Sequence, residues 1–155
     1  MKEDNIKIFL TDCDGVMTDG GMYYFEDGNE AKKFNTKDGF AFSTLRRKNI
    51  KIGIITGENT DIVKNRAKKL KMNILYLGVD NKLDVINEIC KKYKVNYSEI
   101  LYVGDDINDI DSLKKVGIAM CPSDANKKVK KICKYITKAK GGKGVIREIV
   151  DKYFK

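Results

Sequence analysis

Two aspartates one residue apart, Asp12 and Asp14, are the first candidates for chemistry in this chain. They follow residues 6–10, which are apolar and β-prone except for Lys7, and they precede a glycine-containing loop. This pattern predicts a buried strand that ends at the two acids. The carboxyl ends of strands are where open parallel sheets bind ligands, and a carboxylate pair there can hold a divalent cation or attack an electrophile. Asp and Gly are also ordinary turn residues, so the pair alone is equally consistent with a solvated turn.

Three further predicted strands also end in polar side chains. Thr56 closes the second strand, Lys82 lies just beyond the third, and Asp105 and Asp109 follow the fourth. Right-handed crossovers between parallel strands would bring all of these positions to one edge of the sheet.

These residue types suit the chemistry of phosphate esters. Asp12, Asp14 and Asp105 can hold Mg²⁺, which usually takes one or two carboxylates, waters and a phosphate oxygen. Thr56 and Lys82 can bind and neutralise the remaining phosphoryl oxygens. Each residue alone has a simpler explanation, but the ordered set predicts a magnesium-dependent site for phosphoryl transfer.

The chain alternates between predicted strands and helices. Apolar runs predict strands at 6–10, 51–56, 74–77, 100–104 and 117–121. Helices are predicted at 38–48 with Asp38 as the N-cap, at 60–71, 82–93 and 145–153, and in shorter stretches ending near Val116 and beginning near Ala125. Two short runs around an Asp-Gly turn predict a β-hairpin at about 21–35. This order predicts an α/β fold with a doubly wound, mostly parallel sheet.

Length and composition limit the class of protein. The 155 residues suit one domain, 1–155, and a hydrophobic fraction of 42% with 34% charged residues is typical of a soluble globular protein. There is no signal-like apolar segment and no window of 18 apolar residues, so we expect a cytoplasmic protein that does not enter a membrane. Four scattered cysteines without a C-x-x-C pair argue against zinc and for free thiols.

The net charge of +9 raises the question of nucleic-acid binding. Only four of the 31 cationic residues are arginines, and the lysines mostly alternate with predicted core positions. No basic stripe with interleaved aromatic residues results, so we expect no nucleic-acid partner. Attraction of a small anionic substrate is the more direct consequence of the charge.

The ordered motifs resemble those of the haloacid dehalogenase superfamily: D-x-D-G at 12–15, Thr56, Lys82 and G-D-x-x-x-D at 104–109. The resemblance implies that Asp12 is a nucleophile that forms an aspartyl-phosphate. It also implies that Asp14 protonates the leaving oxygen and then activates water. Asp12, the backbone carbonyl of Asp14, and Asp105 would ligate Mg²⁺, with Asn108 and Asp109 in the outer shell.

A narrower resemblance covers nearly the whole chain. The run at 14–20, the hairpin, Asp38-Gly39, and the tail at 141–148 are similar to the small, capless sugar-acid phosphatases. That group includes phosphatases of 3-deoxy-manno-octulosonate 8-phosphate and of nine-carbon 2-keto-3-deoxy sugar acid 9-phosphates, and the C-terminal domain of some sialic acid cytidylyltransferases. The resemblance implies a homotetramer built by the hairpins, in which a neighbouring subunit closes each active site. If the tail closes a neighbour's site, removal of residues 141–155 should impair turnover of the sugar phosphate more than that of a small aryl phosphate.

One departure concerns the choice of substrate. The octulosonate enzymes usually have Thr-Gly-Arg where this chain has Thr56-Gly57-Glu58. Glu58, with Arg66 and Lys69 on the following helix, is more similar to the nine-carbon branch, and an anionic residue can accept hydrogen bonds from sugar hydroxyls. We therefore expect a nonulosonate 9-phosphate as the substrate, bound by Thr56, Gly57, Glu58, Arg66, Lys69 and Lys82, with the eight-carbon 8-phosphate as the alternative. A simpler reading is that Glu58 only favours the positive N-terminus of the next helix.

Other functional classes fit the sequence less well. A receiver-type phosphoacceptor also places acids, Thr and Lys at strand ends, but it lacks a second carboxylate like Asp14 two residues after the nucleophile. A dinucleotide-binding module is disfavoured because no G-x-G-x-x-G joins a strand to a helix. A non-catalytic oligomerisation domain related to the cytidylyltransferases is disfavoured by the intact set of acids.

Overall fold

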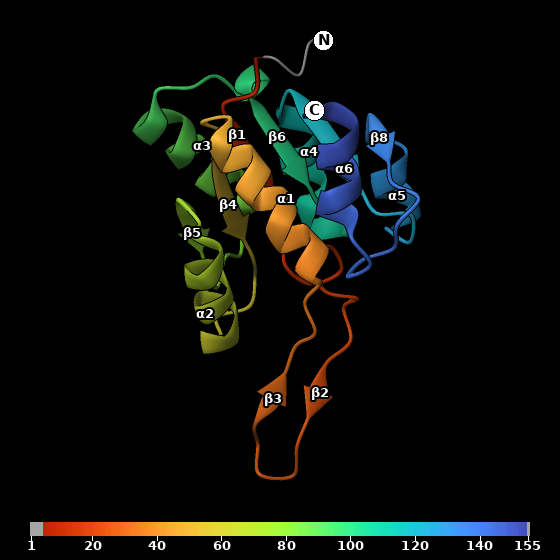
Figure 1. The fold of residues 1–155 in the computed structure, drawn as a ribbon. Helices are drawn as coiled ribbons and strands as arrows, with labels where there is room; N and C mark the ends of the chain where they lie inside the picture. The colour runs from red at the N-terminus through yellow and green to blue at the C-terminus, as the bar shows by residue number, and fades with distance from the viewer. Residues whose placement is uncertain (1–4, 155) are drawn as a thin grey trace.

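A six-stranded parallel sheet forms the centre of the protein. The computed structural model describes residues 5–154, and its strands lie in the order β5-β4-β1-β6-β7-β8, each parallel to its neighbours (Figure 1). The strands are β1 (Ile8–Thr11), β4 (Lys51–Ile55), β5 (Ile74–Tyr76), β6 (Ile100–Val103), β7 (Ile118–Cys121) and β8 (Tyr135–Ile136). The predicted doubly wound sheet is confirmed. Only β8 was not predicted, because its two residues carry no apolar run.

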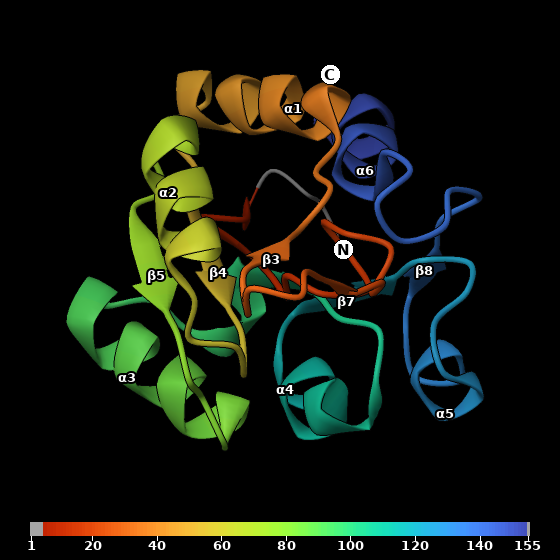
Figure 2. The same cartoon turned by 90° about the horizontal axis from the view of Figure 1, so that it is seen from below.

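Helices cover both faces of the sheet. They are α1 (Thr36–Arg47), α2 (Asp61–Leu70), α3 (Lys82–Tyr93), α4 (Ile110–Lys115), α5 (Lys127–Lys130) and α6 (Val145–Tyr153), with short 3₁₀ turns at Tyr97–Glu99 and Ile107–Asp109. Seen along the strands, α1, α2 and α6 lie on one side of the sheet and α3, α4 and α5 on the other (Figure 2). Each side has its own core: Phe9 and Phe42 belong to the first, and Tyr102 and Ile86 to the second.

Polar caps set the starts of the crossover helices. Asn35 accepts the backbone N–H of Lys37 at the start of α1, and Thr60 accepts that of Val63 at the start of α2. The prediction that Asp38 caps α1 is wrong, because Asp38 lies inside the first turn and is buried. No helix among residues 5–154 is long and apolar enough to cross a bilayer.

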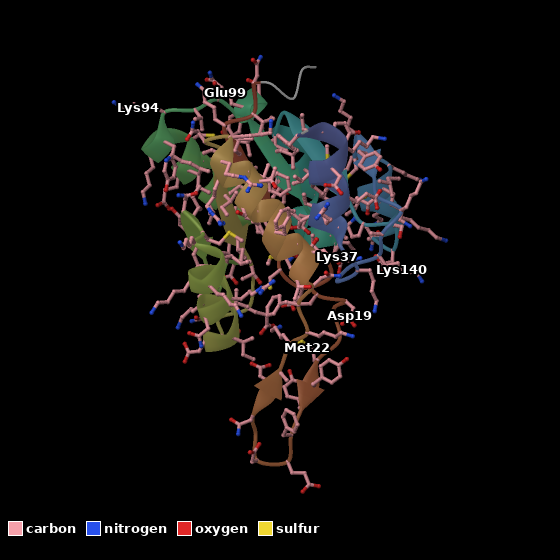
Figure 3. All side chains as sticks on the ribbon, in the orientation of Figure 1. Asp19, Met22, Lys37, Lys94, Glu99 and Lys140 are labelled. Carbon is pink, nitrogen blue, oxygen red and sulfur yellow. The ribbon has the colours of Figure 1, made fainter. Side chains whose placement is uncertain are left out.

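The hairpin formed by β2 (Tyr23–Tyr24) and β3 (Glu30–Ala31) stands clear of the body at the carboxyl edge of the sheet (Figure 1). Figure 3 shows Met22 where the hairpin leaves the body, at the end of the molecule opposite Lys94 and Glu99. Tyr23, Tyr24 and Phe25 are all exposed on it. Three adjacent exposed aromatic side chains are unusual for a surface that faces only water.

The glycine-rich segment 141–144 and helix α6 belong to the body of this chain. The backbone N–H of Gly142 donates to the carbonyl of Val16, and a Cβ on Gly141 would overlap the carbonyl oxygen of Gly15. Helix α6 packs against α1 and buries Ile146 and Ile149 in the core. The truncation of residues 141–155 considered from the sequence would therefore remove core and could not report on closure by a neighbour.

Candidate active site

The site lies where the chain reverses its direction across the sheet. From β1 the chain moves outward to β4 and β5, then returns to β6 on the other side of β1. Such a switch point leaves a crevice at the carboxyl ends of the two central strands. Asp12 follows β1 there and Asp105 follows β6. The cavity measures about 360 Å³ and is lined by Asp12, Asp14, Gly15, Gly20, Met22, Thr56, Gly57, Glu58, Asp105, Asp106 and Asn108.

Asp12 is held in a fixed direction at the floor of this cavity. Its Oδ1 accepts the backbone N–H of Cys13 at 2.7 Å, and its Oδ2 lies 3.0 Å from Nζ of Lys82. Only 6% of the residue is exposed. Burial, and then the nearby negative charge of Asp109, raise the pKa of Asp12 to about 7, although Lys82 acts in the opposite direction.

Lys82 connects the carboxylates of Asp12 and Asp109. It is the first residue of α3, and Asn81 caps that helix through the backbone N–H of Leu83. Its side chain is fully buried, with Nζ 2.7 Å from Asp109 Oδ1 as well as 3.0 Å from Asp12. An ammonium with two carboxylate partners stays charged in this setting, because leaving those carboxylates unpaired would cost more than burying it.

Asp109 organises the loop that presents Asp105. Its Oδ1 accepts the hydroxyl of Tyr102 at 2.5 Å in addition to Lys82, and its Oδ2 accepts the backbone N–H groups of Asp105 and Asp106 at 2.9 and 3.2 Å. Four donors leave this carboxylate little capacity for another partner. Tyr102 is completely buried. It was not predicted as a site residue, because nothing in its strand distinguishes it from the neighbouring apolar residues.

The acidic cluster has the donor set of a divalent-cation site. Among the described residues, oxygens of Asp12, Asp105 and Asp109 lie within 4.8 Å of one another. Oδ1 of Asp105 is buried without a hydrogen-bond partner. Burial and the charges of Asp12 and Asp109 raise the pKa of Asp105 to about 8. Oxygen ligands this close, one of them unsatisfied, fit a hard cation such as Mg²⁺.

Gly15 makes this arrangement possible. Its backbone has φ +82°, which is in the left-handed region, and a Cβ at this position would overlap the Asp105 carboxylate. The glycine of the D-x-D-G motif therefore has a packing reason as well as a turn reason.

Asp14 faces a different set of partners. Lys32 Nζ lies 2.8 Å from both of its carboxylate oxygens, and the Thr18 hydroxyl donates to Oδ1 at 3.1 Å. Lys32 was not predicted as a site residue, since nothing in the sequence distinguishes it from other lysines near the hairpin. Its contact with Asp14 arises only when the hairpin folds back to the body.

Thr56 and its neighbours form the opposite wall. Thr56 directly follows β4, is 1% exposed, and accepts the backbone N–H of Glu58 at 3.2 Å. Gly57 and Glu58 continue along the cavity, and the Glu58 residue is exposed. Asn108, expected in the outer shell of the metal, also lines the cavity.

Arg66 and Lys69 do not line the cavity of their own chain. Arg66 donates to the carbonyl of Asn35 at 3.1 Å and stacks over the ring of Phe34, with 5.1 Å from guanidinium to ring centre. Lys69 is exposed on α2. Neither residue is therefore placed by its own chain to contact a substrate in this cavity.

The comparisons with known proteins agree on one family. Residues 78–149 match the haloacid dehalogenase-like hydrolases. The 3-deoxy-D-manno-octulosonate 8-phosphate phosphatase of Escherichia coli K12 is 34% identical over 150 residues, which is 97% of this chain and 80% of the relative. The corresponding phosphatase of Salmonella typhimurium is 35% identical with the same coverage.

Solved structures give the same result. A 3-deoxy-D-manno-octulosonate 8-phosphate phosphatase from Moraxella catarrhalis, in complex with magnesium ion, phosphate ion and the KDO molecule, superposes with a TM-score of 0.96 at 31% identity, covering 98% of this chain and 87% of that one. The cobalt-bound enzyme from Haemophilus influenzae has a TM-score of 0.95 at 30% identity, covering 99% and 90%.

Proposed function

We propose that this chain, which belongs to the haloacid dehalogenase-like hydrolases, removes the terminal phosphate from a 2-keto-3-deoxy sugar acid phosphate. The observation that carries the proposal is the placement of Asp12 in the lining of the cavity, where it contacts the Lys82 ammonium and lies beside Asp105 and Asp109. Phosphoryl transfer needs such a combination of a nucleophile with positioned charge around the transferred group.

The residues divide the reaction into two halves. In the first, Asp12 bonds to phosphorus while the bond from phosphorus to the sugar oxygen breaks, and that oxygen takes a proton from Asp14. In the second, water attacks phosphorus and gives a proton to Asp14, and the bond from phosphorus to Asp12 breaks to release phosphate. Thr56 lines the cavity, where its hydroxyl could donate to a phosphoryl oxygen. Lys82 is buried behind Asp12 and would act through that carboxylate, by keeping it ionised and directed at phosphorus.

Asp12, Asp105 and the backbone carbonyl of Asp14 would hold Mg²⁺ at this site. The ion supplies positive charge that offsets the negative charge of the phosphate group as the nucleophile approaches. Asp109, whose oxygens are already engaged by four donors, would support the ligands from behind.

Asp12→Asn and metal removal test the chemistry. We expect the variant to lose phosphate release, because an amide is a poor nucleophile and a poor metal ligand. Retention of a tenth of the parent kcat would exclude Asp12 as the nucleophile. Chelation should abolish activity and added Mg²⁺ should restore it. Full activity in metal-free buffer would exclude the metal site.

The eight-carbon acid is the first candidate substrate. The relatives with 34 and 35% identity are 3-deoxy-D-manno-octulosonate 8-phosphate phosphatases, and one structural neighbour was solved with KDO. This support favours the alternative drawn from the sequence over the nine-carbon acid that was preferred there.

Glu58 keeps the nine-carbon acid as a second candidate. It lines the cavity at the position where the sequence departs from the usual pattern of the octulosonate enzymes. If Glu58 reads the sugar, Glu58→Arg should lower kcat/KM for nine-carbon 9-phosphates by roughly ten- to a hundredfold, since a charge-assisted hydrogen bond is lost. It should spare the eight-carbon 8-phosphate. Steady-state rates on both substrates, for the parent and for this variant, measure the preference directly. Equal losses would mean that Glu58 does not select the substrate.

We further propose a homotetramer held by the hairpins. The exposed aromatic side chains of Tyr23, Tyr24 and Phe25 would be buried by other copies of the chain, which would also exclude water from an open cavity. Light scattering should give four times the chain mass of 17.6 kDa. A fully active monomer would exclude this assembly.

A further inference from the structure

Lys32 lies inside the wall of the active site, although it belongs to the hairpin. It follows β3 at the point where the hairpin returns to the body. Its ammonium is 2.8 Å from both oxygens of Asp14 and 3.6 Å from the sulfur of Met22, on the other arm of the hairpin. Figure 3 shows Met22 at this junction. One cation therefore connects the two arms of the hairpin base to Asp14, in the loop at 12–20 that follows β1 (the catalytic loop).

This contact differs from an ordinary surface ion pair. The Lys32 side chain is 1% exposed, whereas the Asp14 side chain is 23% exposed toward the cavity. Pairs on the surface contribute little because both partners remain solvated and mobile. A buried ammonium that contacts both oxygens instead fixes the plane of the carboxylate.

The Asp14 carboxylate is held from two sides. Thr18, in the catalytic loop itself, donates to Oδ1 at 3.1 Å, and Lys32 reaches both oxygens from the hairpin. Thr18 is fixed by local geometry, since it lies four residues along the same loop. Lys32 is placed by the hairpin alone, so the direction of Asp14 depends on the hairpin.

We propose that Lys32 is a positioning residue that aims Asp14 at the leaving oxygen and at the attacking water. The inference rests on the proposed function, in which Asp14 passes a proton to the ester oxygen and later takes one from water. A proton donor must lie within hydrogen-bond reach of its acceptor, and small misplacements of a positioned group cost large factors in rate. The base of the hairpin is thereby part of the catalytic machinery, in addition to any role in assembly.

Adjacent lysines allow a matched comparison. Lys32→Met removes the ammonium and keeps an apolar stem of similar length. Lys33→Met makes the same change at the next residue, which is exposed. Lys32→Arg keeps the charge and should restore part of the activity. Lys32→Gln replaces the Met variant if the latter fails to fold, as checked by circular dichroism.

Two aryl esters of similar shape separate positioning from general damage. Phenyl phosphate has a poor leaving group that needs a proton, whereas 4-nitrophenyl phosphate has a good one that departs without it. General acid catalysis typically contributes 10²- to 10⁴-fold, so we expect Lys32→Met to lower kcat/KM for phenyl phosphate about tenfold or more beyond its effect on 4-nitrophenyl phosphate. We expect kcat to fall for both esters wherever the second half of the reaction limits turnover, because water must still give its proton to Asp14. Lys33→Met should leave both kcat and kcat/KM unchanged for the two esters.

A crystal structure of Lys32→Met gives a readout that does not depend on activity. We expect the Asp14 carboxylate to turn away from its present direction in that variant and to keep it in Lys33→Met. An unchanged Asp14, or equal losses of kcat/KM on the two aryl esters, would overturn the inference.

The outcomes also separate this inference from the proposed substrate. Hydrolysis of the aryl esters with the expected difference, but of no sugar acid phosphate, would support the role of Lys32 and overturn the substrate class. Absence of hydrolysis of every ester by the parent protein would overturn both.

Discussion

Asp38 provides a test of the physical reasoning that is independent of any substrate. The residue is 1% exposed in the first turn of α1, and its Oδ1 accepts the backbone N–H of Arg147 at 2.9 Å. Its Oδ2 is buried without a hydrogen-bond partner, as is Nε of Arg66. Burial raises the pKa of Asp38 from 3.8 to about 6, while the N–H of Arg147 and the charge of Arg66 partly oppose that change.

The sign of the pH dependence follows from this shift. The native carboxyl holds its proton up to a higher pH than the unfolded one, so the native state binds more protons between pH 3.8 and about 6. The contribution of Asp38 to the free energy of unfolding is therefore greatest below that window, falls as the pH rises through it, and is constant above it. A shift of roughly two pKa units at about 1.4 kcal/mol per unit corresponds to a fall of about 3 kcal/mol.

Asp38→Asn should remove this dependence. The amide keeps an oxygen to accept the N–H of Arg147 but cannot ionise. Urea unfolding of parent and variant between pH 4 and pH 7 gives the difference in free energy, in which contributions from Asp12, Asp105 and other groups common to both proteins cancel. We expect the stability of the parent relative to the variant to fall by about 2.5 kcal/mol over that range, slightly less than the full amount because the unfolded carboxyl is already partly ionised at pH 4. Asp84→Asn is the control, because Asp84 is also in the first turn of a helix, α3, but is exposed.

Two results would refute this reasoning. A difference between parent and variant that does not change with pH would mean that Asp38 does not titrate in this range in the folded protein. A parent that gains stability over the variant as the pH rises would mean that Arg66 lowers the pKa of Asp38 more than burial raises it. Either result would also weaken the view that α6 is attached to α1 through a carboxyl group that is neutral below pH 6.

The remaining predictions concern the proposed metal site and the loop that presents Asp105. Tyr102→Phe removes the hydroxyl that donates to Asp109, and a hydrogen bond to a charged group contributes about 1.5–3 kcal/mol, so the Mg²⁺ concentration for half-maximal activity should rise about tenfold or more. Tyr76→Phe, which removes an exposed hydrogen bond to Glu88, should leave it unchanged, and equal behaviour of the two variants would count against the role of Tyr102. Gly15→Ala should abolish Mg²⁺ binding measured by calorimetry, because the new Cβ would overlap the Asp105 carboxylate. Gly28→Ala, at a similar φ of +83° but with open space around it, should bind Mg²⁺ normally, and binding by both variants would exclude the overlap as the reason for glycine at position 15.

The central sheet could be predicted because its strands are short apolar runs buried on both faces. All four residues of β1, β6 and β7 are buried, and that pattern is visible in the sequence. The start of α1 was harder to predict, because Asn35 and Asp38 are both good capping residues. Only the packing of α6 against α1 shows that Asp38 serves the N–H of Arg147, more than a hundred residues away in the chain.

The same distinction applies to the site. Asp12, Asp14, Thr56 and Asp105 lie around one cavity because strand ends in a parallel sheet meet at one edge, which depends only on strand order. Lys32 comes from a hairpin, and where a hairpin returns to the body depends on contacts that no periodic pattern records.

Net charge describes the surface of this protein better than its active site. The whole chain has a formal charge of +9, which suggests attraction of anionic substrates. The cavity itself is lined by carboxylates: Asp12, Asp14, Glu58, Asp105 and Asp106. The ammonium groups of Lys82 and Lys32 are already paired with carboxylates, including those of the lining residues Asp12 and Asp14. Without further positive charge, the site would therefore repel a phosphate dianion. We therefore expect the divalent cation to be needed for binding the phosphate group as well as for the chemical steps. The positive charge of the whole protein would attract the substrate from a distance, and the bound cation would allow its phosphate group to enter the cavity.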